Sequence, residues 1–487
     1  MVRPGVSAMS VYVPRLRVRL EDWCRWTDNS WDKIRNVVGH SFRVCNKHEN
    51  VYTMAANAVL RLIVDNDIDP RNVGFLGLGT ESSTDNAAGA VIVRGMVDLA
   101  LSKLGRPRLS RELEVPEFKH ACLGGVYGLK NALRYVAYDG RDRQAIVVSA
   151  DVAEYERGSS GEQTQGAGAC AMLIESEPKL FEVDLRRSAS ASDYRGPDFR
   201  KPFARHFDAA YATRTERVSD FPVFSGKYST FSYLDETVLA VEGMLGKLGV
   251  SAGQYYDRVT GLFFHRPYHL MPVQAMSFLY ARGLARGDNH QEELAELCDK
   301  AEVTIDQVVA ETNSSPDLYG PILRGEEPRN PYAATSKVAS VLRTQSRFRA
   351  LLDSKMRLGS EWVKDLGNLY TAALPAWVAA GFEHALNDGL ELEGQPMVAV
   401  GYGSGDAAEA MPITPVAGWQ SAAARIGFLR GLAEPIDLTQ EEYEAMHDGR
   451  EANLTYEPRS EFRISHVGSQ YEPAFQDLGV EYYEYVA

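Results

Sequence analysis

A cysteine stands at the start of a predicted helix in the stretch EFKHACLGGVYGLK, residues 117–130. A helix N-terminus carries free N–H groups and a partial positive charge, which stabilise a thiolate and lower the pKa of a thiol. Gly124 and Gly125 leave room for a substrate, and the N–H groups can hold an oxyanion when a thioester is attacked. Cys122 therefore suits a nucleophile. A buried structural thiol is the common alternative, and we interpret Cys170 in GAGACAMLI in that way.

Three more polar positions directly follow or end short apolar runs. Glu81 comes after VGFLGLGT, where a desolvated carboxylate has a raised pKa and can act as a general base. A solvated loop acid is the alternative. His265 follows TGLFF and can polarise a carbonyl, unless it is a satisfied core histidine. Ser404 in GYGSGD offers an N–H and a hydroxyl to an anion among permissive glycines, although such a glycine motif is weak by itself.

Elements that would position these residues alternate along the chain. Short apolar, β-branched runs predict strands over 73–80, 145–152, 169–176, 260–267 and 397–404. Helical patterns cover 51–64, 124–137, 236–248, 292–301 and 371–386, and DLTQEEYEAMHDGREANL predicts a late helix capped by Thr439. The closing GVEYYEYV alternates and predicts a strand. This alternation of strands and helices favours a layered α/β fold.

Two distant segments share one order of features. HACLGGVYGLKNALRYVAYDG precedes AIVVSAD, and LGNLYTAALPAWVAAGFEHALNDG precedes MVAVGYGSG. Each runs from an Ala-rich helix through Asp-Gly to an apolar strand. The pattern predicts an internal duplication that brings Cys122 and Asn368 together at two helix starts. The alternative is that two unrelated αβ units look alike.

Bulk properties exclude several classes of protein. With 487 residues, 45% of them hydrophobic, the chain can bury a large core, and its net charge of −14 argues against nucleic-acid binding. The chain has five cysteines, an odd number, and no pair of them has the sequence spacing of zinc ligands. We therefore expect neither a disulfide framework nor a metal site, and we expect a cytoplasmic location. No long apolar run predicts a membrane span. Neither a Walker loop nor a Rossmann fingerprint occurs.

Taken in order, the motifs resemble the 3-hydroxy-3-methylglutaryl-CoA synthase family of the thiolase superfamily, nearly from end to end. The matching segments are VVGHSFRVCNKHENVYTMA, GTESSTD, HACLGG, SADVAEY, QTQGAGA, DFRKP, FPVFSGKYS, FFHRPY, GNLYT, GYGSG, LTQEEYEAMHDGRE and GVEYYEYV. The resemblance implies a duplicated thiolase-like α/β fold with five αβαβα layers. It also implies a homodimer. We place the halves at residues 1–177, with Glu81 and Cys122, and 178–487.

The resemblance also assigns roles to single residues. It implies that Cys122 takes an acetyl group from acetyl-CoA and that Glu81 removes a methyl proton. It further implies that His265, with Asn368 nearby, polarises the ketone of acetoacetyl-CoA and protonates the new alkoxide. Water then frees hydroxymethylglutaryl-CoA, without a metal or redox cofactor, as in the mevalonate pathway of isoprenoid biosynthesis. The implied substrate-binding residues are Tyr155, Thr164, Ser229, Asn368, Tyr370 and Ser404.

Departures from the family pattern leave alternatives open. The family has lysines about five and nine residues after the histidine, where this chain has Leu270 and Gln274. Arg266 and Ser159 are the substitutes that we consider for binding CoA. An acyl carrier protein is the alternative thioester carrier, as in polyketide β-branching.

Two further alternatives concern the reaction itself. A ketoacyl-synthase-III-like enzyme would use Cys122, His265 and Asn368 to decarboxylate a malonyl thioester, and it would need no base. Glu81 favours the synthase over that reaction. A thiolase-fold scaffold that binds acyl partners without turnover would leave Cys122 unacylated.

Overall fold

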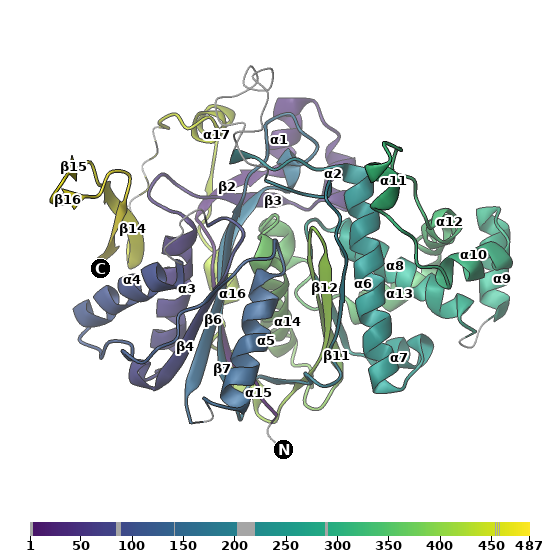
Figure 1. Cartoon of the computed structure of the whole chain (residues 1–487), viewed down its shortest axis with the longest axis horizontal. Coiled ribbons are helices and arrows are strands. Elements are labelled where there is room, and N and C mark those ends of the chain that lie inside the picture. The colour runs from purple at the N-terminus through teal and green to yellow at the C-terminus, as the bar shows by residue number, and fades with distance from the viewer. Residues whose placement is uncertain are drawn as a thin grey trace.

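The computed structural model describes residues 3–83, 89–140, 142–201, 220–287, 291–452, 454, 456 and 458–487. Among these residues one ten-stranded sheet runs through the molecule (Figure 1). Its strands in the first half of the chain are β1 (Gly5–Tyr12), β4 (Val73–Gly79), β5 (Glu117–Phe118), β6 (Gln144–Ala153) and β7 (Gly166–Glu175). Those in the second half are β8 (Phe181–Val183), β9 (Ala189–Ser192), β10 (Gly261–Phe264), β11 (Met397–Gly403) and β12 (Ala407–Pro415).

The two sides of this sheet repeat one topology. The order β4-β6-β7-β1 has a parallel pair followed by two antiparallel pairs, and β10-β11-β12-β8 repeats both the order and the directions. β1 and β8 pair antiparallel and join the two sides. This repetition agrees with the predicted duplication. The division at residues 177 and 178 stays a prediction and falls in the connection between β7 and β8.

Helices cover both faces of the sheet and fill the space between its two halves. Those packed on the strands are α3 (Val51–Asp65), α4 (Gly89–Lys103), α5 (Gly124–Ala137), α6 (Gly226–Leu248) and α14 (Ala373–Asn387). α3 and α4 lie on the first half, and α6 lies on the second. α5 packs on β4, β6 and β7, and α14 packs on β1, β10 and β11. The result is the expected αβαβα layering of a thiolase-like fold.

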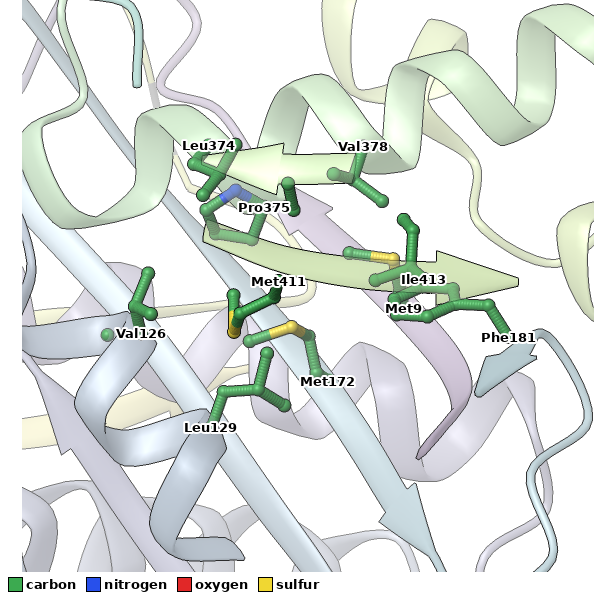
Figure 2. A pocket seen from close by; sticks show the side chains of 12 residues that line it. Met9, Val126, Leu129, Met172, Phe181, Leu374, Pro375, Val378, Met411 and Ile413 are labelled. Carbon is green, nitrogen blue, oxygen red and sulfur yellow. The ribbon is translucent and has the colours of Figure 1, made fainter. Parts of the chain in front are cut away.

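The middle layer is apolar where α5 and α14 meet the strands. Figure 2 shows Val126 and Leu129 of α5 and Leu374 of α14 directed toward Met172 and Met411. These side chains and their neighbours enclose a cavity of about 30 Å³. Such a space has the volume of one water molecule but offers it no polar partner, so it is a packing gap rather than a ligand site.

The remaining elements form peripheral groups (Figure 1). Beside the sheet lie β2 (Leu16–Arg19), α1 (Leu20–Thr27), α2 (Trp31–Val37), β3 (Ser41–Val44), β13 (Ile436–Asp437) and α17 (Gln440–His447). A helical group contains α7 (Ala252–Arg258), α8 (Leu270–Ala285), α9 (Gln291–Ala301), α10 (Ile305–Thr312), α11 (Gly320–Leu323), α12 (Ala333–Leu342) and α13 (Ser346–Lys355). Short helices are α15 (Trp419–Ala423), α16 (Phe428–Leu432) and the 3₁₀ turns η1 (Pro70–Asn72), η2 (Glu162–Thr164), η6 (Trp362–Asp365) and η7 (Tyr370–Ala372). The C-terminal strands are β14 (Glu461–Val467), β15 (Tyr471–Glu472), β16 (Phe475–Gln476) and β17 (Glu481–Val486).

Most predicted elements are confirmed, with bounds that differ by a few residues; the late helix ends at His447, earlier than predicted. α5 has the predicted bounds, and α17 begins after Thr439 with a reciprocal capping box to Glu442. The closing strand β17 is present. α6 begins ten residues before the predicted start, at Gly226, and its N-cap Ser225 makes no side-chain capping bond. In the described part of the chain, none of the helices combines the length and apolar character that a membrane span needs.

Candidate active site

Cys122 lies in a tight turn just ahead of α5. Leu123 N donates to His120 O at 2.9 Å, and Ala121 adopts the left-handed φ of +40° that turns the chain before the thiol. A Cβ on Gly124 would collide with the carbonyl of Phe118, and one on Gly125 would collide with Ser149 Oγ. These glycines therefore let α5 pack on the strands, and the expectation that they make room for substrate is wrong.

The Cys122 thiol contacts Glu81, the residue that follows β4. Sγ donates to Glu81 Oε2 at 3.5 Å. Burial, followed by the charges of Glu81 and Asp151, raises the pKa of Cys122 well above its ordinary value. The helix terminus was expected to lower this pKa, but desolvation and two carboxylates outweigh a partial charge. The resting thiol is therefore protonated and needs a base.

Glu81 has the shifted pKa that such a base requires. Burial and then the charge of Asp151 raise the pKa of Glu81 to about 8, while Lys201 and Lys119 lower it. This is the direction expected for a carboxylate desolvated at a strand end. Above that pH the ionised carboxylate lies directly beside the protonated thiol, which suits proton transfer between them.

Asp151 holds the Glu81 segment in place. Its Oδ1 accepts from Glu81 N at 2.8 Å, from Ser82 N and Oγ at 3.0 and 2.7 Å, and from Thr80 Oγ1 at 2.8 Å. Its Oδ2 accepts from Thr371 N at 2.9 Å and from the Thr371 hydroxyl. One buried carboxylate thus joins the strand end of the first half to η7 of the second.

We expect Asp151→Asn to damage both stability and acylation. The amide replaces an acceptor by a donor that faces existing donors, so the unfolding free energy should fall by about 3 kcal/mol. Urea denaturation and the rate of Cys122 acylation measure the two effects. Asp139→Asn, which removes an exposed carboxylate just after α5, is the control. Unchanged values for the Asp151 variant would show that the hydrogen bonds of this carboxylate are dispensable.

One cavity of about 320 Å³ gathers the predicted site residues. Its lining includes all the predicted substrate-binding residues and two of the three predicted catalytic ones: Cys122, Tyr155, Thr164, Ser229, His265, Asn368, Tyr370 and Ser404. Glu81 reaches this group through its contact with Cys122. Cys122 and Asn368 thus lie together, as the predicted duplication requires.

Aromatic side chains surround the thiol. Tyr155 and Tyr370 form a cluster with Phe199, Phe224 and Cys122, with ring centroids 5.7–6.4 Å apart. The wall shields the thiol from bulk water, which contributes to the desolvation of Cys122. Sequence reasoning missed Phe199 and Phe224 as individual residues, although both lie in motifs, DFRKP and FPVFSGKYS, that carry the family resemblance.

His265 presents a neutral imidazole. The residue is 2% exposed, and burial lowers its pKa to about 3. Its carbonyl accepts from Tyr233 Oη at 3.0 Å, and its ring stacks on Tyr402 with centroids 6.3 Å apart. In the described structure Nδ1 has no hydrogen-bond partner, so this is not a satisfied core histidine. A neutral imidazole can polarise a carbonyl by donating one hydrogen bond.

Asn368 offers a second donor to the cavity. Its side-chain Oδ1 accepts from the backbone N–H of Tyr370 at 2.9 Å, and its backbone N–H donates to Thr164 O at 3.1 Å. Because the carbonyl side of the amide is occupied, a ligand can use only the Nδ2 group, which carries two N–H donors and also hydrogen-bonds Tyr155.

The two residues considered for CoA lie apart from this lining. Arg266 is buried; it donates to Ser360 O at 3.0 Å, and its guanidinium lies over the Trp377 ring. Ser159 Oγ accepts from Gly161 N at 3.3 Å, and neither Ser159 nor Arg266 lines the cavity. Its burial and its bond to Ser360 make Arg266 unsuited to an ion pair with CoA, whereas a CoA contact of Ser159 stays a prediction. No cluster of metal-ligating side chains occurs among the described residues.

Comparison with known proteins gives one consistent result. Residues 3–179 match the family model described as hydroxymethylglutaryl-coenzyme A synthase N terminal. Hydroxymethylglutaryl-CoA synthase of Haloferax volcanii is 24% identical over 486 residues, covering 98% of this chain and 99% of that protein. A Fusarium hydroxymethylglutaryl coenzyme A synthase is 26% identical, with 96% and 95% covered.

Solved structures share the fold over the full length. MvaS in complex with 3-hydroxy-3-methylglutaryl coenzyme A has a TM-score of 0.75 at 24% identity, and all of both chains is covered. The curacin pathway HMG synthase in complex with its acetyl donor carrier protein has a TM-score of 0.69 at 18% identity, covering 99% of this chain and all of that one. The thiolase-like fold class is thereby confirmed.

Proposed function

We propose that the chain is a hydroxymethylglutaryl-CoA synthase, which its match to the N-terminal family model and its full-length relatives support. It would condense acetyl-CoA with acetoacetyl-CoA and release hydroxymethylglutaryl-CoA. One observation carries the proposal. A single cavity joins a cysteine nucleophile, which contacts a carboxylate of raised pKa, to a neutral histidine and an asparagine amide. Acylation, enolate formation and carbonyl polarisation require these groups.

The first step is acylation of the thiol. Cys122 Sγ attacks the thioester carbonyl of acetyl-CoA, and its proton passes to the Glu81 carboxylate at 3.5 Å. CoA leaves as a thiol and takes up that proton. The result is an acetyl thioester on Cys122 and an ionised Glu81, ready to act again as a base.

The second step makes and uses the carbanion. Glu81 removes a proton from the acetyl methyl, and N–H groups near Cys122 and Ser404 stabilise the enolate. The enolate attacks the ketone carbon of acetoacetyl-CoA, whose oxygen accepts hydrogen bonds from His265 and Asn368. A neutral imidazole polarises well but is a poor acid, so we assign protonation of the new alkoxide to Glu81, which removed the methyl proton, rather than to His265. Water then hydrolyses the bond to Cys122.

The test supplies both CoA thioesters to the purified protein. We expect loss of acetoacetyl-CoA that depends on acetyl-CoA, with hydroxymethylglutaryl-CoA identified by mass spectrometry. If neither CoA thioesters nor their carrier-protein counterparts give a condensation product, the proposed synthase activity is wrong.

One observation favours the carrier-protein alternative. Leu270 and Gln274 line the cavity at the start of α8, where the family pattern has lysines. An uncharged rim gives the phosphates of CoA no ion pair at these two positions. Product formed from an acetyl carrier protein, but not from acetyl-CoA, would assign the chain to polyketide-type β-branching.

The homodimer is also part of the proposal. β5 ends the sheet and pairs only with β4 among the described strands, and Val91 and Leu99 of α4 are 46% and 54% exposed. A Cβ on Gly95, between them, would meet no atom within 4 Å. A second copy would cover this edge beside the turn of Cys122.

The proposed cytoplasmic setting is supported by five unpaired cysteines, and the proposed pathway is the mevalonate route.

We expect a dimer by sedimentation velocity. Leu99→Glu should convert it to a monomer, because a buried unpaired carboxylate in an interface is costly. Leu323→Glu is the matched control, since Leu323 is exposed on α11, away from α4. A wild-type monomer at micromolar concentration would contradict this part of the proposal.

A further inference from the structure

Two buried carboxyl groups share one tyrosine hydroxyl behind the cavity. Asp198 is 0% exposed and Asp406 is 3% exposed. Tyr402 Oη lies 3.0 Å from Asp198 Oδ2 and 3.1 Å from Asp406 Oδ1. The backbone N–H of Gly405 also donates to Asp406 Oδ1. Tyr402 lines the reaction cavity, so this arrangement adjoins the site already described.

The arrangement requires a proton on one of the two carboxyl groups. A phenol has one proton, so it can donate to only one of the two oxygens that it contacts. If both carboxylates were ionised, the other contact would place two lone pairs together and two like charges in a buried site. With one proton shared by the pair, every contact has a donor and an acceptor.

The nearest cation does not neutralise the pair. Arg195 Nη2 donates to Asp235 Oδ2 at 2.6 Å and to Glu236 Oε1 at 3.1 Å, both on α6. No ion pair joins Arg195 to Asp198 or Asp406 among the described residues. The other ionisable groups that face this region are Asp193 on the preceding segment, Tyr228 on α6 and the Cys122 thiol, which interacts with the charge of Asp198.

The electrostatics agree with a protonated member. Burial, and then the hydrogen bond and charge of Asp198, raise the pKa of Asp406 to about 9. The N–H of Gly405 and the charge of Arg195 act in the opposite direction but do not cancel this effect.

The turn that carries Asp406 also carries a cavity residue. Ser404 and Tyr402 both line the cavity, and Tyr402 stacks on the His265 ring. Tyr233 packs edge-on against Tyr402 with centroids 4.9 Å apart and donates to the carbonyl of His265. A shift of Tyr402 would therefore move both the wall behind His265 and the Ser404 turn.

We propose that Asp198 and Asp406 share one proton, and that this proton holds Tyr402 and the 404–406 turn against the cavity. Asp406 is then a positioning residue for His265 and Ser404. The catalytic consequence rests on the proposed function, whereas the shared proton does not. Loss of the proton at alkaline pH would leave two ionised carboxylates in contact with one phenol. Their repulsion would displace Tyr402 and the 404–406 turn from the cavity.

The kinetic test compares pH profiles of kcat. Wild type should lose activity on the alkaline side, near pH 9. Asp406→Asn keeps a neutral donor at all pH values, so it should remove this alkaline limb. Asp406→Ala should lower kcat at every pH by about 10- to 100-fold, and Asn should rescue part of that loss. Asp193→Asn, which removes a half-exposed carboxylate from the adjacent segment, should leave the limb in place. An alkaline limb that persists in Asp406→Asn would overturn the positioning role.

A second measurement needs no activity. A carboxyl whose pKa is raised on folding contributes stability below its unfolded value, and this contribution is lost as pH rises to the folded value. The Tm of wild type should therefore fall relative to that of Asp406→Asn as pH rises from about 4 to about 9. Infrared difference spectra at pH 7 should show a protonated carboxyl band that the variant lacks. A constant Tm difference without that band would overturn the shared proton, even if the condensation proceeds as proposed.

Discussion

Replacing Cys122 by serine is expected to abolish acetylation of the protein and to lower turnover by about 10⁴-fold or more. The hydroxyl of serine is a far weaker acid than the thiol, and the buried surroundings that raise the pKa of Cys122 would disfavour an alkoxide still more. Glu81, whose pKa is about 8, cannot take a proton from such a group. The position tolerates the smaller atom, so the variant should fold.

Intact-protein mass after mixing with acetyl-CoA measures this effect. Wild type should gain one acetyl group, and Cys122→Ser should gain none. Cys45→Ser is the matched control because Cys45 is the other partly exposed thiol, and it should be acetylated like wild type. An acetyl group that persists on Cys122→Ser would place the nucleophile elsewhere. If wild type itself stays unlabelled by both acetyl-CoA and an acetyl carrier protein, the scaffold alternative replaces the enzyme.

Replacing Glu81 by glutamine or alanine should lower condensation by about 10²- to 10⁴-fold, the range for a general base. Acetylation of Cys122 should suffer less, because loss of the Glu81 carboxylate also removes a charge that raises the pKa of the thiol, whereas the methyl proton of an acetyl group is far less acidic. The two rates, measured separately by mass and by product, should therefore diverge. Glu112→Gln, which removes an exposed carboxylate, is the control.

The pH dependence gives the same residue a second signature. Glu81 must be ionised to act, so wild-type condensation should rise as pH increases through about 8. Glu81→Gln should lose this rise. If the variants keep full activity and decarboxylate a malonyl thioester, the chain is a ketoacyl-synthase-like enzyme, since that reaction generates its own carbanion.

Local signals in the sequence determined most of the framework. Apolar runs of β-branched residues predicted β4, β6, β7 and β11 within a few residues, because buried strands need continuous apolar sequence. The bounds of α5 and the capping box at Thr439 also followed from neighbours in sequence. The order of motifs led to the prediction that Glu81, Cys122, His265 and Asn368 form the site, and these residues lie in or beside one cavity.

Tertiary structure decided how these groups behave. The pKa of Cys122 is raised rather than lowered, because burial and the carboxylates of Glu81 and Asp151 lie outside its own segment. The Asp151 contacts span 71 residues to Thr80 and 220 residues to Thr371. Asp198 and Asp406 likewise meet at Tyr402 only because β11 and the segment before α6 fold together. Residue type and spacing determine which chemistry is available, whereas desolvation and distant charges determine where each proton resides.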